Sequence, residues 1–226
     1  MDFKIPFIVI IISYFIGSIP FGLLIVKIKT GRDIRYIESG RTGGTNAMRA
    51  GGLSAGIFTV ILDAIKSAAM VWLARWLAPG NSWLEVLSPT VAVIGHNYSI
   101  FLLERKPAGG YRFRGGAGGA TTVGGAIGLW HYSVLIILPI TLLIWFGVGY
   151  ASLATISSSL LSLILFSILA KLGICPWQYI LYGVFTLIIL LWALRPNIKR
   201  LIDGNERLIG WRAHHRKKHT AHIGAK

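Results

Sequence analysis

Cysteine is nearly absent from this sequence, and acidic residues are scarce. Its 226 residues include one cysteine, Cys175, which excludes a disulfide within the chain and argues against a thiolate metal site. Asp and Glu number 8 against 23 Lys and Arg, so the formal net charge is +15. A charge of this size suits either nucleic acid or an anionic membrane surface. Because the basic residues flank apolar runs, anionic lipid headgroups are the better match, and we expect no nucleic-acid partner.

Three familiar signatures are also missing. The glycine-rich segment 31–52 lacks the Gly-Lys-Ser/Thr ending of a nucleotide P-loop. No small-residue cleavage site follows the first apolar run, so we expect it to be a retained span and not a cleaved signal peptide. The paired repeats typical of secondary transporters are not evident either, which favours other classes of membrane protein.

Most of the chain is apolar enough to lie in a bilayer. Hydrophobic residues make up 54% of it and its mean hydropathy is +0.65, well outside the composition of a soluble domain. The apolar runs are long and do not alternate as barrel strands do, so they predict helices. We therefore predict an all-α integral membrane protein with about seven spans, at residues 5–26, 53–78, 86–103, 120–130, 133–149, 152–170 and 177–194. The domain would cover residues 1–210, followed by a basic, flexible tail at 211–226.

The charged segments between these spans predict the orientation of the chain. Segments 29–52, 104–119 and 195–210 are rich in basic residues, whereas the connections 79–85, 131–132 and 171–176 contain almost none. Cytoplasmic loops carry the excess of Lys and Arg. This predicts a multi-pass protein of the cell membrane with an external N-terminus, a cytoplasmic C-terminus and all three rich segments on the cytoplasmic face.

The first of these segments has the residues of an anion site. Closely spaced glycines let backbone N–H groups turn toward an anion, and Ser39, Thr45 and Asn46 add neutral hydrogen-bonding groups. Arg49 adds a guanidinium that can bind phosphate through two parallel hydrogen bonds. The alternative is a flexible basic connector, and this segment alone does not decide between them.

Three ionisable residues inside predicted spans are candidate site residues. Asp63 and Lys66, three residues apart, share a helix face and can pair. Charges at this depth usually face a polar interior, so the pair either supports a site or fixes helix packing. His96 is a candidate general base or phosphate ligand, with Asn97 beside it. The alternative for His96 is a satisfied packing residue.

A second glycine-rich turn leads directly into a predicted span. It reads Arg-Phe-Arg-Gly-Gly-Ala-Gly-Gly at residues 112–119. A helix N-terminus with free N–H groups favours anions, and Arg112 and Arg114 stand beside it. The alternative is that small residues at this point serve close helix packing. The glycines concerned are Gly119, Gly124, Gly125 and Gly128.

Together these motifs resemble the bacterial acyl-phosphate:glycerol-3-phosphate acyltransferases. The resemblance extends to about Gly210. It rests on Gly-Ser-Ile-Pro-Phe-Gly at 17–22, Gly40, Gly-Thr-Asn at 44–46, Arg49, Asp63 with Lys66, Gly95-His96, the turn 113–118 with Ala-Thr at 120–121, Tyr-Ala-Ser-Leu at 150–153, Asn197-Ile198-x-Arg200-Leu201 and Gly204-x-Glu206.

The resemblance implies seven spans and a defined reaction. An acyl group would pass from acyl phosphate to the 1-hydroxyl of glycerol 3-phosphate, giving lysophosphatidic acid and phosphate for phospholipid biosynthesis. Neither a cofactor nor a metal is implied, and we expect a monomer in contact with membrane lipids. The implied catalytic residues are Arg49, His96, Asn97 and Asn197. Substrate phosphate would be bound by Ser39, Thr45, Asn46, Lys66, Arg114, Gly115, Gly116 and Gly118, with support from Asp63, Ser152 and Glu206.

The chain departs from the family pattern at several positions. Ala117 stands where the turn usually has lysine, and Arg112 and Arg114 are the candidates to replace that charge. Leu194 stands where a histidine usually precedes the final motif. The first loop has Arg-Thr-Gly at 41–43 in place of Asn-Ile-Gly, and a stretch around 105–111 is additional. The alternatives left open are a same-fold transferase with another phosphorylated acceptor, a degenerate member, and an organic-phosphate transporter.

Overall fold

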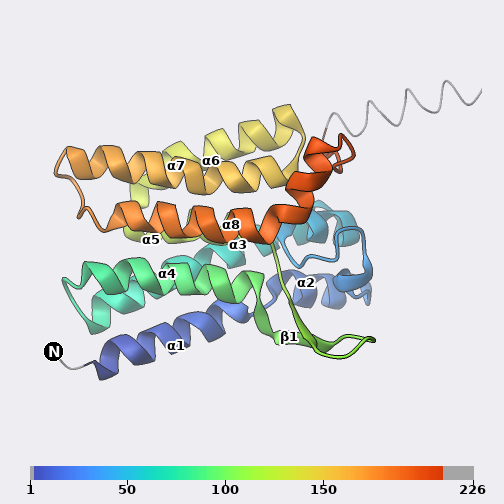
Figure 1. Cartoon of the computed structure of the whole chain (residues 1–226), viewed down its shortest axis with the longest axis horizontal. Coiled ribbons are helices and arrows are strands. Elements are labelled where there is room, and N and C mark those ends of the chain that lie inside the picture. The colour runs from blue at the N-terminus through green and yellow to red at the C-terminus, as the bar shows by residue number, and fades with distance from the viewer. Residues whose placement is uncertain (1–2, 211–226) are drawn as a thin grey trace, which may run out of the picture.

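The computed structural model describes residues 3–210, which form a helical bundle with one β-hairpin (Figure 1). The predicted tail at 211–226 lies outside the described residues. In chain order the elements are α1 (Lys4–Ser18), α2 (Phe21–Thr30), η1 (Ile34–Tyr36), α3 (Gly44–Leu77), α4 (Ser82–Asn97), β1 (Ser99–Arg105), β2 (Tyr111–Arg114), α5 (Gly119–Leu129), η2 (His131–Ser133), α6 (Val134–Leu143), η3 (Ile144–Val148), α7 (Ala151–Lys171) and α8 (Tyr179–Ile202).

Proline and glycine break the helices near the polar end. The first predicted span is divided into α1 and α2 at Pro20, which lacks the N–H needed to continue a helix. In α3, Gly52 has φ 82° and ψ 176°, so residues 44–51 form a separate short helix before the long membrane helix. A residue with a side chain avoids this left-handed φ. These two breaks allow the first loop to fold back over the end of the bundle.

The β-hairpin corrects the all-α prediction. The predicted span 86–103 is a helix only from Ser82 to Asn97, and the chain then continues as strand β1, antiparallel to β2. Hydropathy did not distinguish the two because the polar residues at the junction, His96, Asn97 and Ser99, are too few to interrupt the averaged apolar run. A hydrogen bond of 2.6 Å from Ser99 Oγ to the Ser18 carbonyl oxygen holds the start of β1 against α1.

Small residues bring the helices close together. A side chain at Gly17 would strike the backbone of Ala92, so α1 and α4 pack at that point. Gly124 and Gly183 make the same kind of backbone contact between α5 and α3 and between α8 and α7. Such small-residue contacts are typical of membrane helices, whose association relies on close packing. The packing interpretation of Gly124 is thus confirmed.

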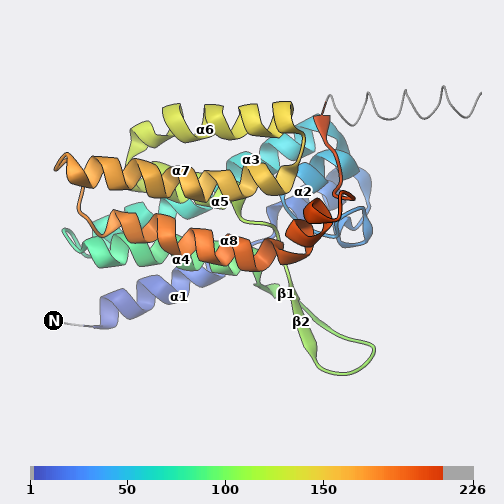
Figure 2. The same cartoon turned by 45° about the horizontal axis from the view of Figure 1, so that its top comes forward.

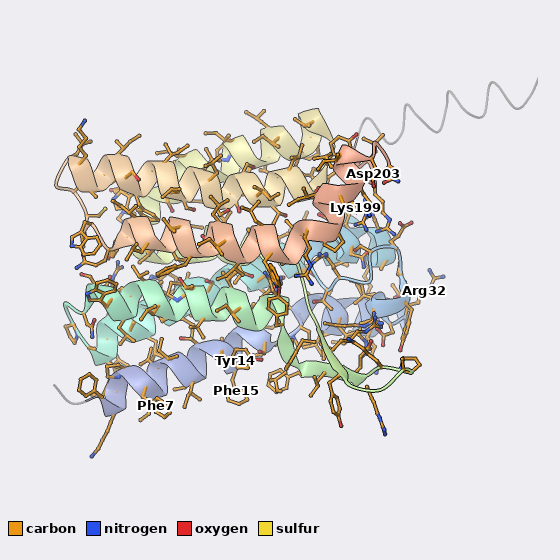
Figure 3. The ribbon with its side chains drawn as sticks, viewed as in Figure 1. Phe7, Tyr14, Phe15, Arg32, Lys199 and Asp203 are labelled. Carbon is orange, nitrogen blue, oxygen red and sulfur yellow. The ribbon has the colours of Figure 1, made fainter. Side chains whose placement is uncertain are left out.

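Large apolar side chains cover the outer surface of the bundle. Along α1, for example, Phe7 and Phe15 are 67% and 47% exposed, and Figure 3 shows them along one side of that helix, with Arg32, Lys199 and Asp203 at the other end of the molecule. Within residues 3–210, five helical segments are long and apolar enough to cross a membrane: Lys4–Thr30, Gly44–Leu77, His131–Val148, Ala151–Lys171 and Tyr179–Ile202. The protein is therefore a mostly helical membrane protein.

The three basic segments meet at one end of the bundle. The first loop, the hairpin with its glycine turn, and the end of α8 all lie at the end opposite the N-terminus (Figures 1 and 2). Hydrogen bonds join them, since Arg114 donates to the Arg35 carbonyl oxygen at 2.7 Å and Arg41 donates to that of Ala193 at 2.7 Å. The prediction that these segments share one face is confirmed.

Candidate active site

The first loop is held over the bundle end by Asn46, near the start of α3. Its amide nitrogen donates to three backbone carbonyl oxygens, those of Ile34, Ile37 and Arg41, at 3.3, 3.0 and 2.8 Å. Asn46 is buried, so these bonds organise the loop from inside. The side chain predicted to bind phosphate has its donor committed to the protein. These bonds hold the backbone of the loop in place.

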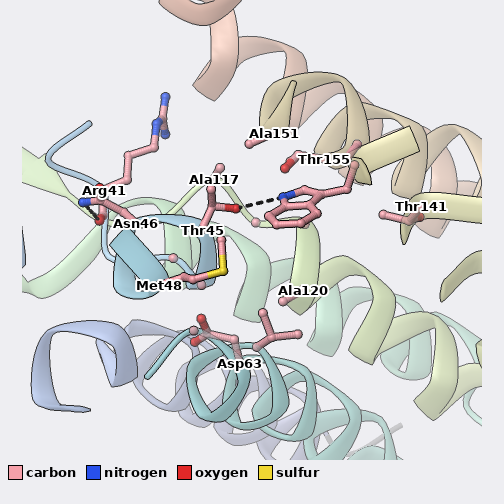
Figure 4. Close-up of a pocket in the computed structure, with 18 of the residues that line it drawn as sticks. Arg41, Thr45, Asn46, Met48, Asp63, Ala117, Ala120, Thr141, Ala151 and Thr155 are labelled. Atoms are coloured by element: carbon pink, nitrogen blue, oxygen red, sulfur yellow. Dashed lines mark hydrogen bonds between the residues drawn. The ribbon is translucent and has the colours of Figure 1, made fainter. Parts of the chain in front are cut away.

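Ser39, Thr45 and Arg49 surround the head of a cavity. Thr45 Oγ1 accepts a hydrogen bond of 3.3 Å from Trp145 Nε1, which links α3 to η3 (Figure 4). Arg49 makes one long bond, 3.4 Å, to the Leu208 carbonyl oxygen. It has no carboxylate partner within the described part of the chain, so much of its donor capacity faces the cavity.

Asp63, Lys66 and His96 form a buried cluster between α3 and α4. Lys66 Nζ lies 2.7 Å from Asp63 Oδ1, 3.0 Å from His96 Nδ1 and 2.9 Å from the Ile19 carbonyl oxygen. These three contacts use all three N–H donors of the ammonium group. Asp63 and His96 line the cavity, whereas Lys66 does not. The structure therefore places Lys66 behind the site, where it fixes Asp63 and His96.

The glycine turn packs against the end of α4. Gly116 N–H donates to the His96 carbonyl oxygen at 2.9 Å. A Cβ at Gly115 would strike the His96 and Asn97 carbonyl groups, and one at Gly116 would strike the imidazole. Gly118 has φ 91° and begins α5, a conformation that favours glycine. The turn needs glycine both for this close approach and for the start of the helix.

The end of α8 reaches the site through Asn197. Its Nδ2 donates to Glu206 Oε1 at 2.9 Å, and Arg200 Nε donates to Glu206 Oε2 at 3.0 Å. Asn197 Oδ1 accepts from Arg41 Nη2 at 3.2 Å. Glu206, predicted as a supporting residue, is thus brought to the site, where it contacts Asn197 and Arg200.

Arg41 is the site residue that the sequence analysis missed. Besides Asn197, its guanidinium donates to the carbonyl oxygens of Gly116 and Ala193, at 2.9 and 2.7 Å. Burial lowers the pKa of Arg41, and the nearby charge of Arg200 adds to the shift, but an arginine remains charged. The sequence did contain one indication of its importance. Arg41 departs from the family pattern, and so does Ala117, where a positive charge is missing.

Two other predicted residues differ in how they reach the site. Ser152, near the start of α7, lines the cavity with a buried hydroxyl that has no hydrogen-bond partner in residues 3–210. Arg114 instead pairs with Glu104 at 2.7 Å and points to the hairpin side. The structure does not bring Arg114 to the cavity, and Arg112 pairs with Glu104 as well. Neither takes the place of the lysine missing at Ala117.

The cavity has a volume of about 490 Å³, is lined mostly by apolar residues, and has Arg41, Arg49 and Arg207 in its wall. Residues of α3, α5, α6 and η3 line its long apolar part, among them Ile57, Val60, Ile61, Val123, Leu142 and Phe146. The arginine head and the apolar body lie in one continuous space. Figure 4 shows part of this arrangement, with Arg41 and Asn46 near Ala117 and Thr141 on the far side. The fold and site thus define a membrane protein whose cavity joins an arginine-bearing head to an apolar body.

Comparison with known proteins gives the family. The model of the glycerol-3-phosphate acyltransferase family matches residues 7–204, and the chain belongs to that family. A glycerol-3-phosphate acyltransferase of Halalkalibacterium halodurans is 31% identical over 220 residues, covering 96% of this chain and 99% of the relative. Glycerol-3-phosphate acyltransferase 3 of Dehalococcoides mccartyi is 36% identical over 217 residues, covering 91% and 96%.

Solved structures support the same assignment. The crystal structure of PlsY, an integral membrane glycerol 3-phosphate acyltransferase, in its glycerol 3-phosphate form matches with a TM-score of 0.73 and 28% identity. The match covers 91% of this chain and 96% of that one. The lysophosphatidic acid form of PlsY matches with a TM-score of 0.71 and 27% identity, covering 91% and 95%. The family resemblance seen in the sequence is confirmed.

Proposed function

We propose that this protein transfers a fatty acyl group from acyl phosphate to the 1-hydroxyl of glycerol 3-phosphate. The products are lysophosphatidic acid and inorganic phosphate. The observation that carries the proposal is the cavity, whose arginine-bearing head continues into an apolar body among α3, α5 and α6. This shape suits a fatty acyl chain with a phosphate at its end.

The chemistry needs little beyond positioning. The glycerol hydroxyl oxygen forms a bond to the acyl carbonyl carbon, and the bond from that carbon to the phosphate oxygen breaks. Phosphate is a good leaving group, so a covalent enzyme intermediate is unnecessary. Holding the two reactants in line lowers the barrier by removing much of its entropic part. Cations and N–H groups stabilise the charge on the carbonyl oxygen and the departing phosphate.

The residues at the cavity head divide this work. Arg49 and Ser39 bind phosphate together with the first N–H groups of α3, and the N–H groups of the glycine turn serve a second phosphate. Arg41, held by Asn197, places a second cationic group between the glycine turn and α8. His96 and Asn97 orient the hydroxyl, and the hydroxyl proton passes to a substrate phosphate oxygen.

The same proposal includes the arrangement in the membrane. We count α4 and α5 as crossings in addition to the five candidate membrane helices, because they lie alongside the long helices in Figure 1. Seven crossings with an external N-terminus put the basic end in the cytoplasm, in keeping with the excess of Lys and Arg there. The cavity is formed within one chain, which supports a monomer as the working unit.

Phosphate release tests the reaction. The purified protein is incubated with palmitoyl phosphate, with and without glycerol 3-phosphate, and the lipid products are identified by mass spectrometry. We expect release that depends on glycerol 3-phosphate, with lysophosphatidic acid formed in equal amount. If phosphate is released only when a different phosphorylated acceptor is added, that acceptor replaces glycerol 3-phosphate in the proposal.

A second measurement separates an enzyme from a carrier. Vesicles that contain the protein are loaded with glycerol 3-phosphate, and efflux is followed without an acyl donor. The proposal expects no efflux above that of protein-free vesicles. Efflux together with an absence of product from a folded sample would identify an organic-phosphate transporter on this fold.

A further inference from the structure

A second cavity lies beside the first and is lined by arginines. It has a volume of about 460 Å³ and is bounded by the first loop, the hairpin and the end of α8. Six arginines line it: Arg41, Arg112, Arg114, Arg195, Arg200 and Arg207. We call it the arginine cleft. No carboxylate lines the cleft, so its wall within residues 3–210 has charge of one sign.

Carboxylates outside the cleft wall neutralise only part of this charge. Glu104 pairs with Arg112 and Arg114, and Glu206 pairs with Arg200 at 3.0 Å. Arg207 has a looser contact of 3.7 Å with the exposed Glu38. Neither Arg41 nor Arg195 has a carboxylate partner in the described part of the chain. Two guanidinium groups are thus left to attract an anion.

The guanidinium groups of the cleft select the chemistry of the anion. Arginine pairs with phosphate oxygens bidentately. Asn97 also lines the cleft, but the polar atoms of its side chain are buried beside Gly118, so they do not face the anion.

The cleft adjoins the cavity of the proposed active site. Ser39, Arg41, Asn197 and Arg207 line both spaces. Arg41 is fixed at this boundary by its bonds to Gly116, Ala193 and Asn197. The apolar body of the first cavity lies toward the membrane interior, while the cleft is bounded by the polar loops. The cavity therefore reaches the residues that it shares with the cleft from the lipid side, and the cleft reaches them from the polar side.

We propose that the arginine cleft is a further phosphate-binding site beside the cavity of the proposed active site, which takes a phosphate monoester or inorganic phosphate from the aqueous side. It collects the soluble substrate beside the cavity and receives the phosphate that the reaction releases. The inference deepens the proposed function and rests on it for the role of the bound anion. A lipid phosphate headgroup has the same chemistry, and the experiment separates the two sources.

Binding of inorganic phosphate tests the site without turnover. Isothermal titration of the protein in phosphatidylcholine nanodiscs is expected to give one bound phosphate more for the native chain than for Arg195→Gln. Arg112→Gln, on the opposite wall, provides a second variant should Arg195→Gln fold poorly. Arg32→Gln is the matched control, because Arg32 is an exposed arginine at the same end that does not line the cleft.

Kinetics give the functional readout. In Arg195→Gln we expect the KM for glycerol 3-phosphate to rise about tenfold, the effect of losing one charge-assisted hydrogen bond. The KM for palmitoyl phosphate is expected to stay within a factor of about two, since the donor enters from the lipid side. Both KM values of Arg32→Gln are expected to match those of the native protein.

Nanodiscs that contain phosphatidic acid distinguish the sources. If a headgroup occupies the cleft, phosphatidic acid displaces one phosphate from the native protein but none from Arg195→Gln. If free phosphate is the ligand, the stoichiometry is the same in both lipids. Binding and KM values of both cleft variants equal to those of Arg32→Gln in either lipid would overturn the proposal. Arg195-dependent binding without transferase activity would overturn the proposed function alone.

Discussion

Gly116 lies against the His96 imidazole, and its N–H donates to the His96 carbonyl oxygen at 2.9 Å. The glycine turn is therefore part of the wall that holds His96 in place. Lys66 approaches the same ring from the other side, with Nζ 3.0 Å from Nδ1. Because two elements fix the imidazole, a small change in the turn is expected to reach the cavity head.

Replacing Gly116 with alanine tests this contact. The new Cβ would overlap the imidazole, so His96 or the turn must move, and a displaced catalytic group lowers rate steeply. We expect kcat/KM to fall by about tenfold or more. Gly147→Ala is the control, because a Cβ there meets no atom within 4 Å. Equal activity of the two variants would show that the geometry of the turn is not used.

Arg49→Ala is expected to abolish most turnover. Removal of one group that stabilises transition-state charge typically costs about 100-fold in kcat, and Arg49 is held by the protein through one long bond only. Expression and the elution volume in detergent should match the native protein. Arg32→Ala serves as the control with the same charge change. Near-native activity of Arg49→Ala would exclude it as the phosphate ligand.

The buried pair of Asp63 and Lys66 is expected to matter for stability. Replacing one member of a buried pair leaves an uncompensated charge and costs about 3–5 kcal/mol. Lys66→Met should therefore lower the thermal unfolding midpoint markedly. The double variant Asp63→Leu with Lys66→Met should recover more than half of the loss, although its activity should stay low.

The matched control for that experiment is a more exposed pair. Arg35 Nη2 lies 2.6 Å from Asp33 Oδ2, with side-chain exposures of 26% and 29%. Hydrogen bonding from Arg35 lowers the pKa of Asp33, but pairs near solvent contribute at most about 1 kcal/mol. Asp33→Asn should hardly change the midpoint. A shift as large as that of Lys66→Met would show that burial is not the cause.

Arg41 is expected to supply the positive charge that Ala117 lacks. Its guanidinium is 2.9 Å from the Gly116 carbonyl oxygen, adjacent to residue 117. We expect Arg41→Gln to lower kcat/KM by about tenfold, the loss of one charge-assisted bond. Adding Ala117→Lys to that variant should restore most of the activity. In the native background, Ala117→Lys should bring little gain, because Arg41 already holds a charge there. Failure of the rescue would contradict this exchange of roles.

The hydropathy and charge of the chain were enough to predict a helical membrane protein with its basic segments at one end. Those properties are additive along the chain, so they need no knowledge of packing. Helix termini were less predictable. The apolar run that passes Asn97 continues into β1, because a strand and a helix both tolerate apolar residues and only contacts with α1 and β2 separate them.

The motifs determined which residues gather at the site, and the tertiary structure decided what each one faces. Lys66 and Asn46 belong to the site region, but their donors are used within the protein. Arg114 turns to Glu104, whereas Arg41, an ordinary loop arginine in the sequence, reaches the boundary between two cavities. The direction of a long side chain depends on which carbonyl and carboxylate oxygens lie nearby. Those neighbours come from segments far apart in the chain, and only the folded bundle brings them together.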